Sequence, residues 1–254
     1  MPAFLVTLCL WLAATAVHAQ VSIEIGYLTQ AVARPPVLST LDRRPEDLGQ
    51  AGAMLGIAEN NTTGRFTGQD YALTVAEVPE DGDALAAARQ LLQGSDLLVL
   101  DVPAGTLLAI ADLPEAADAL LFNASAPDLA LRDGACRANL LHTAPSYAMR
   151  TDALAQFLVY RRWARLAMIA GTHPDDQAFA ASLRGSLRKF GLKLGAEKAW
   201  NTEADLRRAA AQEVPLFTQD LAEHDLLLVA DEIGDFGRYI AYNSWLPRLV
   251  GGCL

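Results

Sequence analysis

Polar side chains stand at the points where the apolar runs of this 254-residue chain end. If those runs are parallel strands, their carboxyl ends meet at one edge of a sheet, where open α/β proteins bind ligands. Side chains there that ion-pair, hydrogen-bond or stack are therefore candidates for holding a small molecule. The candidate ligand-binding residues are Arg34, Asp101, Asn123, Ser125, His142, Thr143, Ser146, Thr172, Glu232, Trp245 and Arg248.

Several of these candidates also have a purely structural interpretation. Thr143 and Ser146 could only cap the helix that follows them, although the amide groups of a helix start also bind carboxylates well. His142 could be a hydrogen-bonded core histidine, Trp245 a packing residue and Arg34 a solvated loop charge. The clustering of these residues at strand ends therefore carries more weight than any one of them.

Motifs for catalysis are missing from the sequence. No G-x-G-x-x-G follows a strand, and neither a phosphate-binding loop nor a G-x-S-x-G turn occurs. The four histidines and three cysteines form no metal-binding motif. We therefore expect a protein that binds a small molecule without catalysis, a cofactor or a metal; an exported α/β enzyme is the alternative.

The start of the chain predicts export. Leu5–Val17 is an apolar run too short to span a bilayer, and residues 1–19 are expected to be a signal peptide cleaved after Ala19. No Lys or Arg precedes the run, so a buried core helix is the alternative. In an oxidising compartment, Cys136 and Cys253 could pair. The net charge of −10 argues against nucleic acid as a partner.

Strand and helix patterns alternate along the rest of the chain. Strands are expected over Ser22–Leu28, Tyr71–Val78, Asp96–Val102, Ala119–Ala124, Asn139–His142, Arg165–Ala170, Leu192–Trp200 and Asp225–Ala230. Helices are expected over Pro45–Glu59, Asp83–Gly94, Ala104–Asp112, Ser146–Trp163 and Pro174–Gly191, and a further one opens at a Thr202–Asp205 capping box. This alternation predicts an α/β fold with parallel sheets.

The pattern runs twice and predicts two lobes, residues 20–142 and residues 143–254. In the helix after Ser146, the residues Ala153, Phe157 and Tyr160 share one face and are expected to pack. In the next helix, Phe179, Leu183, Leu187 and Phe190 form the corresponding apolar face.

Several segments resemble the type I periplasmic binding proteins of ABC importers, the branched-chain amino-acid-binding class. The segments that carry this resemblance are Ala53–Phe66, His142–Ser146, Asp152–Val159 and Leu226–Glu232. A branch associated with pyrroloquinoline quinone-dependent alcohol oxidation is similar over Arg137–Ser146, Tyr160–Trp163, Ala230–Gly237 and Ala241–Arg248. The resemblance implies two Rossmann-like lobes that close on a ligand.

The resemblance also implies a role and partners. The expected role is that of a monomeric periplasmic component that delivers a carboxylate-bearing ligand to an inner-membrane ABC permease; a sensor of the same fold is the alternative. The ligand would be an amino acid, held by Thr143 and Ser146, or pyrroloquinoline quinone, held by Arg34, Arg248, Trp245 and the Ser146 helix start. Since the family continues beyond the segment around Arg248, the second crossing back to the first lobe is expected to be missing, with poor solubility as a result.

Overall fold

The computed structural model of the chain describes residues 20–35, 45–201, 205–243 and 249–252. The predicted signal peptide, the candidates Trp245 and Arg248, and the proposed Cys136–Cys253 pair therefore fall wholly or partly outside the described residues. The described chain forms two compact units. The first contains residues 20–31, 45–124 and 138–141, and the second contains residues 32–35, 125–137 and the described residues from 142 onward. The segment 125–137 thus packs with the second unit, although it precedes residue 142.

The first unit is built on a five-stranded sheet with the order β2-β1-β3-β4-β5. Its elements are β1 (Val21–Gln30), α2 (Gln50–Thr67), β2 (Gln69–Val78), α3 (Ala84–Leu92), β3 (Leu97–Asp101), α4 (Ala104–Ala111), the short η2 (Pro114–Ala116), β4 (Leu120–Asn123) and β5 (Leu140–His142). Strand β1 runs parallel to both β2 and β3, with Gly26 opposite Leu98. Strands β3 and β4 are parallel as well, as the alternating pattern predicts.

Helix α2 differs from its predicted range of 45–59, because it begins at Gln50 and continues to Thr67. Gly49 precedes it at φ +87°, and a Cβ there would lie 2.4 Å from the Tyr27 hydroxyl. The run of Asn and Thr after Glu59 is a poor helix former, yet Asn61 bonds both backbone groups of Tyr71 in β2, at 2.8 and 2.7 Å. These two hydrogen bonds to β2 stabilise the helical conformation after Glu59, where the low helix propensity of the sequence alone would end the helix.

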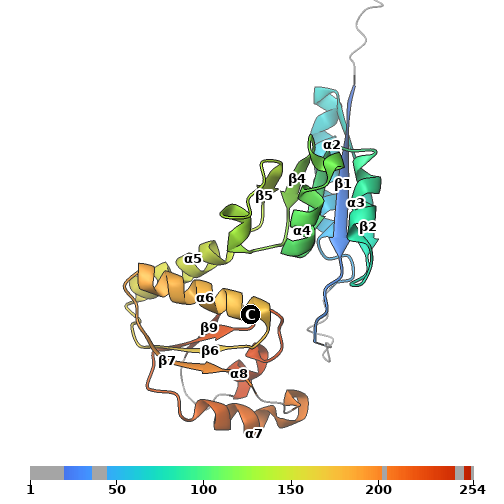
Figure 1. Cartoon of the computed structure of the whole chain (residues 1–254). Coiled ribbons are helices and arrows are strands. Elements are labelled where there is room, and N and C mark those ends of the chain that lie inside the picture. Colours follow the sequence, from blue (N-terminus) through green and yellow to red (C-terminus); the bar gives the residue numbers. More distant parts are fainter. Residues whose placement is uncertain (1–19, 36–44, 202–204, 244–248, 253–254) are drawn as a thin grey trace, which may run out of the picture. The chain divides into compact units, whose positions relative to one another are not determined.

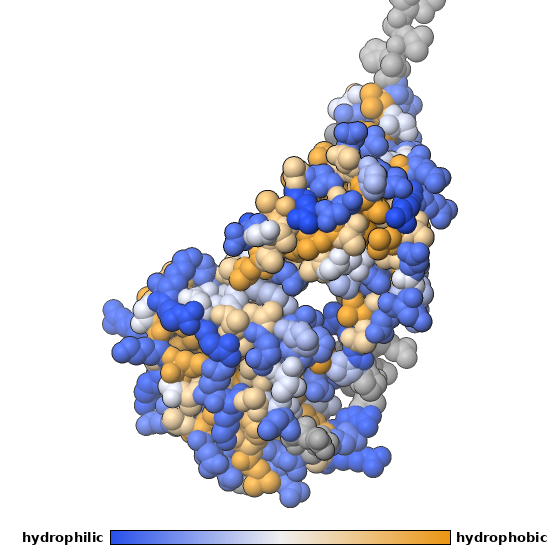
Figure 2. Space-filling model, viewed as in Figure 1, coloured by the Kyte–Doolittle hydropathy of each residue, from blue (hydrophilic) through white to orange (hydrophobic). Residues whose placement is uncertain are grey.

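Helix α4 carries no charged side chain, and Thr106 is its one polar residue. Two of its own side chains, Leu107 and Ile110, are fully buried. Figure 2 shows hydrophobic side chains gathered at the surface of the first unit over α4.

The second unit is built on a four-stranded parallel sheet with the order β7-β6-β8-β9. Its elements are η3 (Leu129–Arg132), α5 (Tyr147–Arg161), β6 (Leu166–Ala170), α6 (Pro174–Lys189), β7 (Leu194–Ala199), α7 (Leu206–Thr218), β8 (Leu226–Ala230), α8 (Gly237–Asn243) and β9 (Leu249–Gly252). Every residue of β6 and β8 is buried, which confirms the interpretation of these apolar runs as central strands. Helices α5 and α6 cover one face of the sheet, and α7 and α8 cover the other (Figure 1).

The prediction that Ala153, Phe157 and Tyr160 form the packing face of α5 is wrong. Phe157 and Tyr160 are 49% and 81% exposed, whereas the side chains that α5 buries include Thr151, Ala155 and Leu158. Thr151 is fully buried, and its hydroxyl lies 2.9 Å from that of Ser182 and 2.8 Å from that of Ser186. The contact between α5 and α6 therefore includes buried hydroxyl groups beside the apolar residues that both helices bury.

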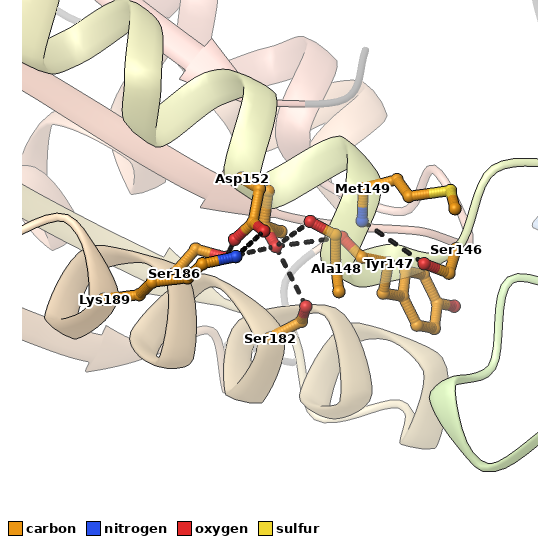
Figure 3. Close-up of polar contacts among 9 residues, drawn as sticks. Ser146, Tyr147, Ala148, Met149, Asp152, Ser182, Ser186 and Lys189 are labelled. Carbon is orange, nitrogen blue, oxygen red and sulfur yellow. Dashed lines mark hydrogen bonds and ion pairs between the residues drawn. The ribbon is translucent and has the colours of Figure 1, made fainter. Parts of the chain in front are cut away.

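Charged groups extend this hydroxyl contact toward the solvent. Ser186 donates to the Asp152 carboxylate at 2.6 Å, and Lys189 pairs with the same carboxylate. Figure 3 shows Ser186 and Lys189 of α6 converging on Asp152 of α5. The hydrogen bonds with Ser186 and Lys189 hold the pKa of Asp152 below its usual value.

Replacing Thr151 with valine is expected to lower the free energy of unfolding by about 2 kcal/mol, because a buried serine hydroxyl loses its partner. Thr151→Val combined with Ser182→Ala removes both members of one pair, so the double variant should lose less than the sum of the two single variants. Urea unfolding curves of the three variants measure this coupling, and strict additivity would contradict the network. Thr62→Val on exposed α2 is the control, with an expected change below about 0.5 kcal/mol.

The residues that begin and cap the helices of this unit are those predicted from the sequence, with one correction. Ser146 caps α5 and Pro174 is the first residue of α6, as expected. Asp205, expected inside a capping box, is itself the residue that caps α7, accepting the Arg207 amide at 3.1 Å. Among the described residues, no helix is long and apolar enough to cross a membrane.

Candidate functional site

A cavity of about 360 Å³ opens at the carboxyl ends of β6, β7 and β8 in the second unit. Its size lies within the range of small-molecule sites. The residues that line it are Gly171, Thr172, His173, Pro174, Asp176, Trp200, Ile233, Asp235 and Phe236. The Trp200 and Phe236 rings stack with centroids 4.9 Å apart, so one wall of the cavity is a rigid aromatic pair beneath polar loops.

The loop after β8 is shaped by the Asp231 carboxylate, which is 7% exposed. One oxygen accepts the amides of Gly234 and Asp235, and the other accepts those of Phe236 and Gly237, at distances of 2.6 to 3.0 Å. Asp231 therefore acts as a cap for the start of α8 and holds Phe236 against Trp200.

Asp176, in the first turn of α6, ties the start of that helix to the loop after β8. Its side chain is 1% exposed and accepts the amide of Glu232 at 2.6 Å. Burial raises the pKa of Asp176, and the nearby Asp231 carboxylate raises it further, while the amides of Glu232 and Ile233 oppose the rise. The cavity thus lies between the segment after β6 and the loop after β8, which the buried Asp176 carboxylate connects through its hydrogen bond with the Glu232 amide.

Glu232 forms a bidentate ion pair with Arg150 of α5, with N–O distances of 2.8 and 2.9 Å. The Arg150 guanidinium also lies over the rings of Tyr147 and Phe179, 5.6 and 5.0 Å from their centroids. The two side chains are 26% and 12% exposed. The Arg150–Glu232 ion pair therefore has a fixed geometry, and both side chains remain partly accessible to solvent.

Four further sequence candidates are described by the structure. Thr172 lines the cavity and is exposed. Ser146 is buried and accepts the Met149 amide at 3.3 Å (Figure 3), so it serves as a cap while its hydroxyl proton remains able to bond elsewhere. His142 is half-buried with a ring nitrogen 3.2 Å from the Leu131 carbonyl, and burial and Arg132 lower its pKa. Thr143 is exposed beside it.

Arg34 and Ser125 are exposed and lie in the segments of the second unit that precede residue 142 in the sequence. Their role in binding stays a prediction, as does that of Trp245 and Arg248, which lie outside the described residues.

The candidates Asp101 and Asn123 lie at the carboxyl ends of β3 and β4 in the first unit. Asn123 is fully buried. Asp101 accepts the Tyr27 hydroxyl at 3.2 Å, and burial together with this carboxylate raises the pKa of Tyr27 to about 12. Gln30 accepts the Thr106 hydroxyl at 2.9 Å at the same edge. The carboxyl edge of the first sheet is thus polar and hydrogen-bonded.

Sequence reasoning missed Tyr147 and Arg150. One signal was available, because a positive charge in the first turn of a helix opposes the helix dipole. Arg150 occupies that turn, so its presence indicates a compensating acid, which is Glu232. The residues next to Tyr147 in the sequence contain no comparable indication of its role.

No three His, Cys, Asp or Glu side chains in the described part of the chain come together as a group that could hold a metal ion.

The periplasmic binding protein model matches residues 46–212, well over half of the 254 residues. The chain belongs to the periplasmic binding protein family. This match spans most of the first unit and the second unit as far as α7. A comparison with curated proteins gave no match.

Solved periplasmic binding proteins share the fold. An ABC transporter substrate-binding protein from Desulfitobacterium hafniense, in complex with Leu, has a TM-score of 0.65 at 14% identity, over 91% of this chain and 65% of that one. A branched-chain amino acid transporter substrate-binding protein from Streptococcus pneumoniae, in complex with isoleucine, has a TM-score of 0.63 at 14% identity, over 91% and 64%. A periplasmic binding protein from Burkholderia mallei has a TM-score of 0.59 at 17% identity, over 91% and 60%.

The chain therefore has the α/β, parallel-sheet fold of type I periplasmic binding proteins, as expected. It spans about two thirds of the length of these solved periplasmic binding proteins or slightly less.

Proposed function

We propose that this chain is a periplasmic solute-binding component of an ABC importer and does no chemistry on its ligand. The ligand is a small carboxylate-bearing molecule, an amino acid or a compound like pyrroloquinoline quinone. An inner-membrane permease is the partner, and the exported protein is a monomer. The observation that carries the proposal is the cavity at the carboxyl ends of β6, β7 and β8 in a member of the periplasmic binding protein family.

The cavity offers the groups that such a ligand needs. Exposed Thr172 supplies a hydroxyl, and the Trp200–Phe236 stack supplies an apolar wall. Two similar solved proteins were crystallised with Leu or isoleucine, which makes these amino acids reasonable first probes.

Calorimetric titration of the purified chain with leucine, isoleucine and pyrroloquinoline quinone tests the proposal. At a ligand concentration of about 100 times Kd, binding should raise the free energy of unfolding by about 2.7 kcal/mol. Thr172→Trp fills the cavity mouth from an exposed position and is expected to weaken binding at least about tenfold without lowering the melting temperature.

Thr63→Trp, on the exposed surface of α2, is the matched control and should bind as the parent does. A protein that melts cooperatively but binds no member of an extended panel of amino acids and carboxylic acids would overturn the proposal, as would turnover of a bound compound.

A further inference from the structure

A second cavity of the second unit, about 510 Å³ in volume, lies between the last turns of α6 and the start of β7. Strand β7 is the outer strand of its sheet, and α6 covers one face of that sheet (Figure 1). The cavity shares no lining residue with the candidate ligand cavity, and it lies toward the amino end of β7 and not at the carboxyl ends of the strands. Its volume is within the range of small-molecule sites.

An irregularity in β7 leaves room for this cavity. The pairing of β7 with β6 shifts register so that Gly195 is the extra residue. Leu194 pairs with Leu166, which packs on the α6 side of the sheet. Glu197 pairs with Met168 on that same side. Two residues instead of one therefore separate these side chains, and one of the two is a glycine. Bulges and strand glycines recur where a ligand approaches the backbone.

The charges that line the cavity are mostly positive, although the whole chain has a net charge of −10. The acid Glu197 is neutralised, because the Arg184 Nε lies 3.1 Å from both of its carboxylate oxygens. Arg188 and Lys193 are exposed in the same lining, and neither has a carboxylate partner within the described part of the chain. Lys189, the other basic residue in the last turn of α6, is ion-paired. The lining thus offers two cations to an anion.

The floor of the cavity is apolar. Leu187 is 2% exposed, and Leu192 and Leu194 are partly buried against the same core cluster. All three line the cavity. A small inorganic anion would leave this apolar surface in contact with water, whereas an anion with an apolar body would cover it, which is favourable.

We propose that this cavity binds an anionic amphiphile, a molecule in which an acidic group is attached to an apolar body. Arg188 and Lys193 hold the acidic group, and the apolar body lies on the leucine floor. Arginine and lysine both recognise carboxylate and phosphate groups, so either acid fits. This second ligand site does not depend on the proposed function.

Compounds with the same alkyl chain test the site on the full chain. Octanoate and octyl phosphate carry an acidic group, octanol carries no charge, and octylamine carries a positive charge. Calorimetry should show that the two acids bind at least about tenfold more tightly than octanol and octylamine. From hexanoate to heptanoate to octanoate, each added methylene should tighten binding by up to about fourfold. Raising the salt concentration should weaken binding of the acids.

Variants locate the site. Arg188→Gln and Lys193→Gln should each weaken octanoate binding at least about threefold, and Arg188→Glu at least about tenfold. Arg208→Gln removes the same charge from an 89% exposed side chain of α7, on the other face of the sheet, and should change nothing. Thr172→Trp, which fills the mouth of the candidate ligand cavity, should bind octanoate as the parent does. Melting curves establish that each variant is folded.

Three results would overturn the amphiphile site. The first is that neither acid binds, or that octanol or octylamine binds as tightly as octanoate. The second is an unchanged octanoate affinity in Arg188→Glu and Lys193→Gln. The third is loss of octanoate binding in Thr172→Trp, which would assign the compound to the candidate ligand cavity. Leucine and isoleucine binding is measured separately, so the proposed function stands or fails independently of these results.

Discussion

Substituting alanine for Gly171 is expected to lower the free energy of unfolding of the second unit by about 3 kcal/mol and to abolish ligand binding. A Cβ at this position would lie 2.1 Å from an Asp176 carboxylate oxygen and 3.0 Å from the Phe236 ring. Neither neighbour can withdraw easily, because Asp176 is 1% exposed and bonded to the Glu232 amide, and Phe236 is stacked on Trp200. The Gly171 backbone is itself fixed by its bond to Ala230 at 2.9 Å.

Urea unfolding followed by tryptophan fluorescence measures this loss. Gly185→Ala in α6 is the matched control, since a Cβ there meets nothing within 4 Å. Because alanine favours a helix interior over glycine, the control should gain about 0.5 to 1 kcal/mol. Equal stability of Gly171→Ala and the parent protein would show that the packing of the two loops around the cavity is looser than described.

Replacing Asp231 with asparagine is expected to cost about 3 kcal/mol. The carboxylate accepts four backbone amides with two oxygens. Asparagine presents an NH₂ group to two of them and leaves those amides without their acceptor. The loop should then release Phe236 from Trp200, so the melting temperature and the ligand affinity should fall together.

Asp235→Asn is the control for this variant, because it makes the same change in the same loop without removing an amide bond. Burial and the Asp231 charge raise the pKa of Asp235, so a neutral side chain is well accommodated there. If Asp235→Asn destabilised the protein as much as Asp231→Asn, general loop electrostatics and not the amide cap would explain the loss.

The central strands of the second sheet were predictable from sequence because their signal is local. The runs that became β6 and β8 are apolar at every position, which is typical of parallel strands covered on both faces. The start of α6 was predictable for the same reason, since Pro174 and the acids after it are helix-start signals.

The packing of α5 and the end of α2 were not predictable in this way. Phe157 and Tyr160 are more hydrophobic than Thr151, yet Thr151 is the buried residue because α6 supplies Ser182 and Ser186 opposite it. Helix α2 continues past Glu59 because Asn61 bonds to Tyr71. Both outcomes depend on a partner in another element, which the periodicity of one helix cannot reveal.

The sequence predicted that polar side chains would lie at the carboxyl edge of the second sheet, but not which of them would line the cavity. Thr172 and Glu232 lie at the second sheet's carboxyl edge, as expected from their positions after apolar strands. Arg150, which holds Glu232, is 82 residues away in the sequence. Ion pairs over such separations leave no spacing pattern, so the partner of Glu232 emerged only from the fold.

The strand order of the first unit also governs how the chain folds as it is synthesised. Strand β1 lies inside the sheet between β2 and β3, but its Gly26 pairs with Leu98, which is 98 − 26 = 72 residues later in the sequence. A ribosome adding roughly 5 to 20 residues per second needs about 4 to 14 seconds to make that stretch. During this interval one edge of β1 is open to pairing with other strands. Late closure of the sheet thus makes the nascent first unit a natural substrate for chaperones, well before the second unit has been translated.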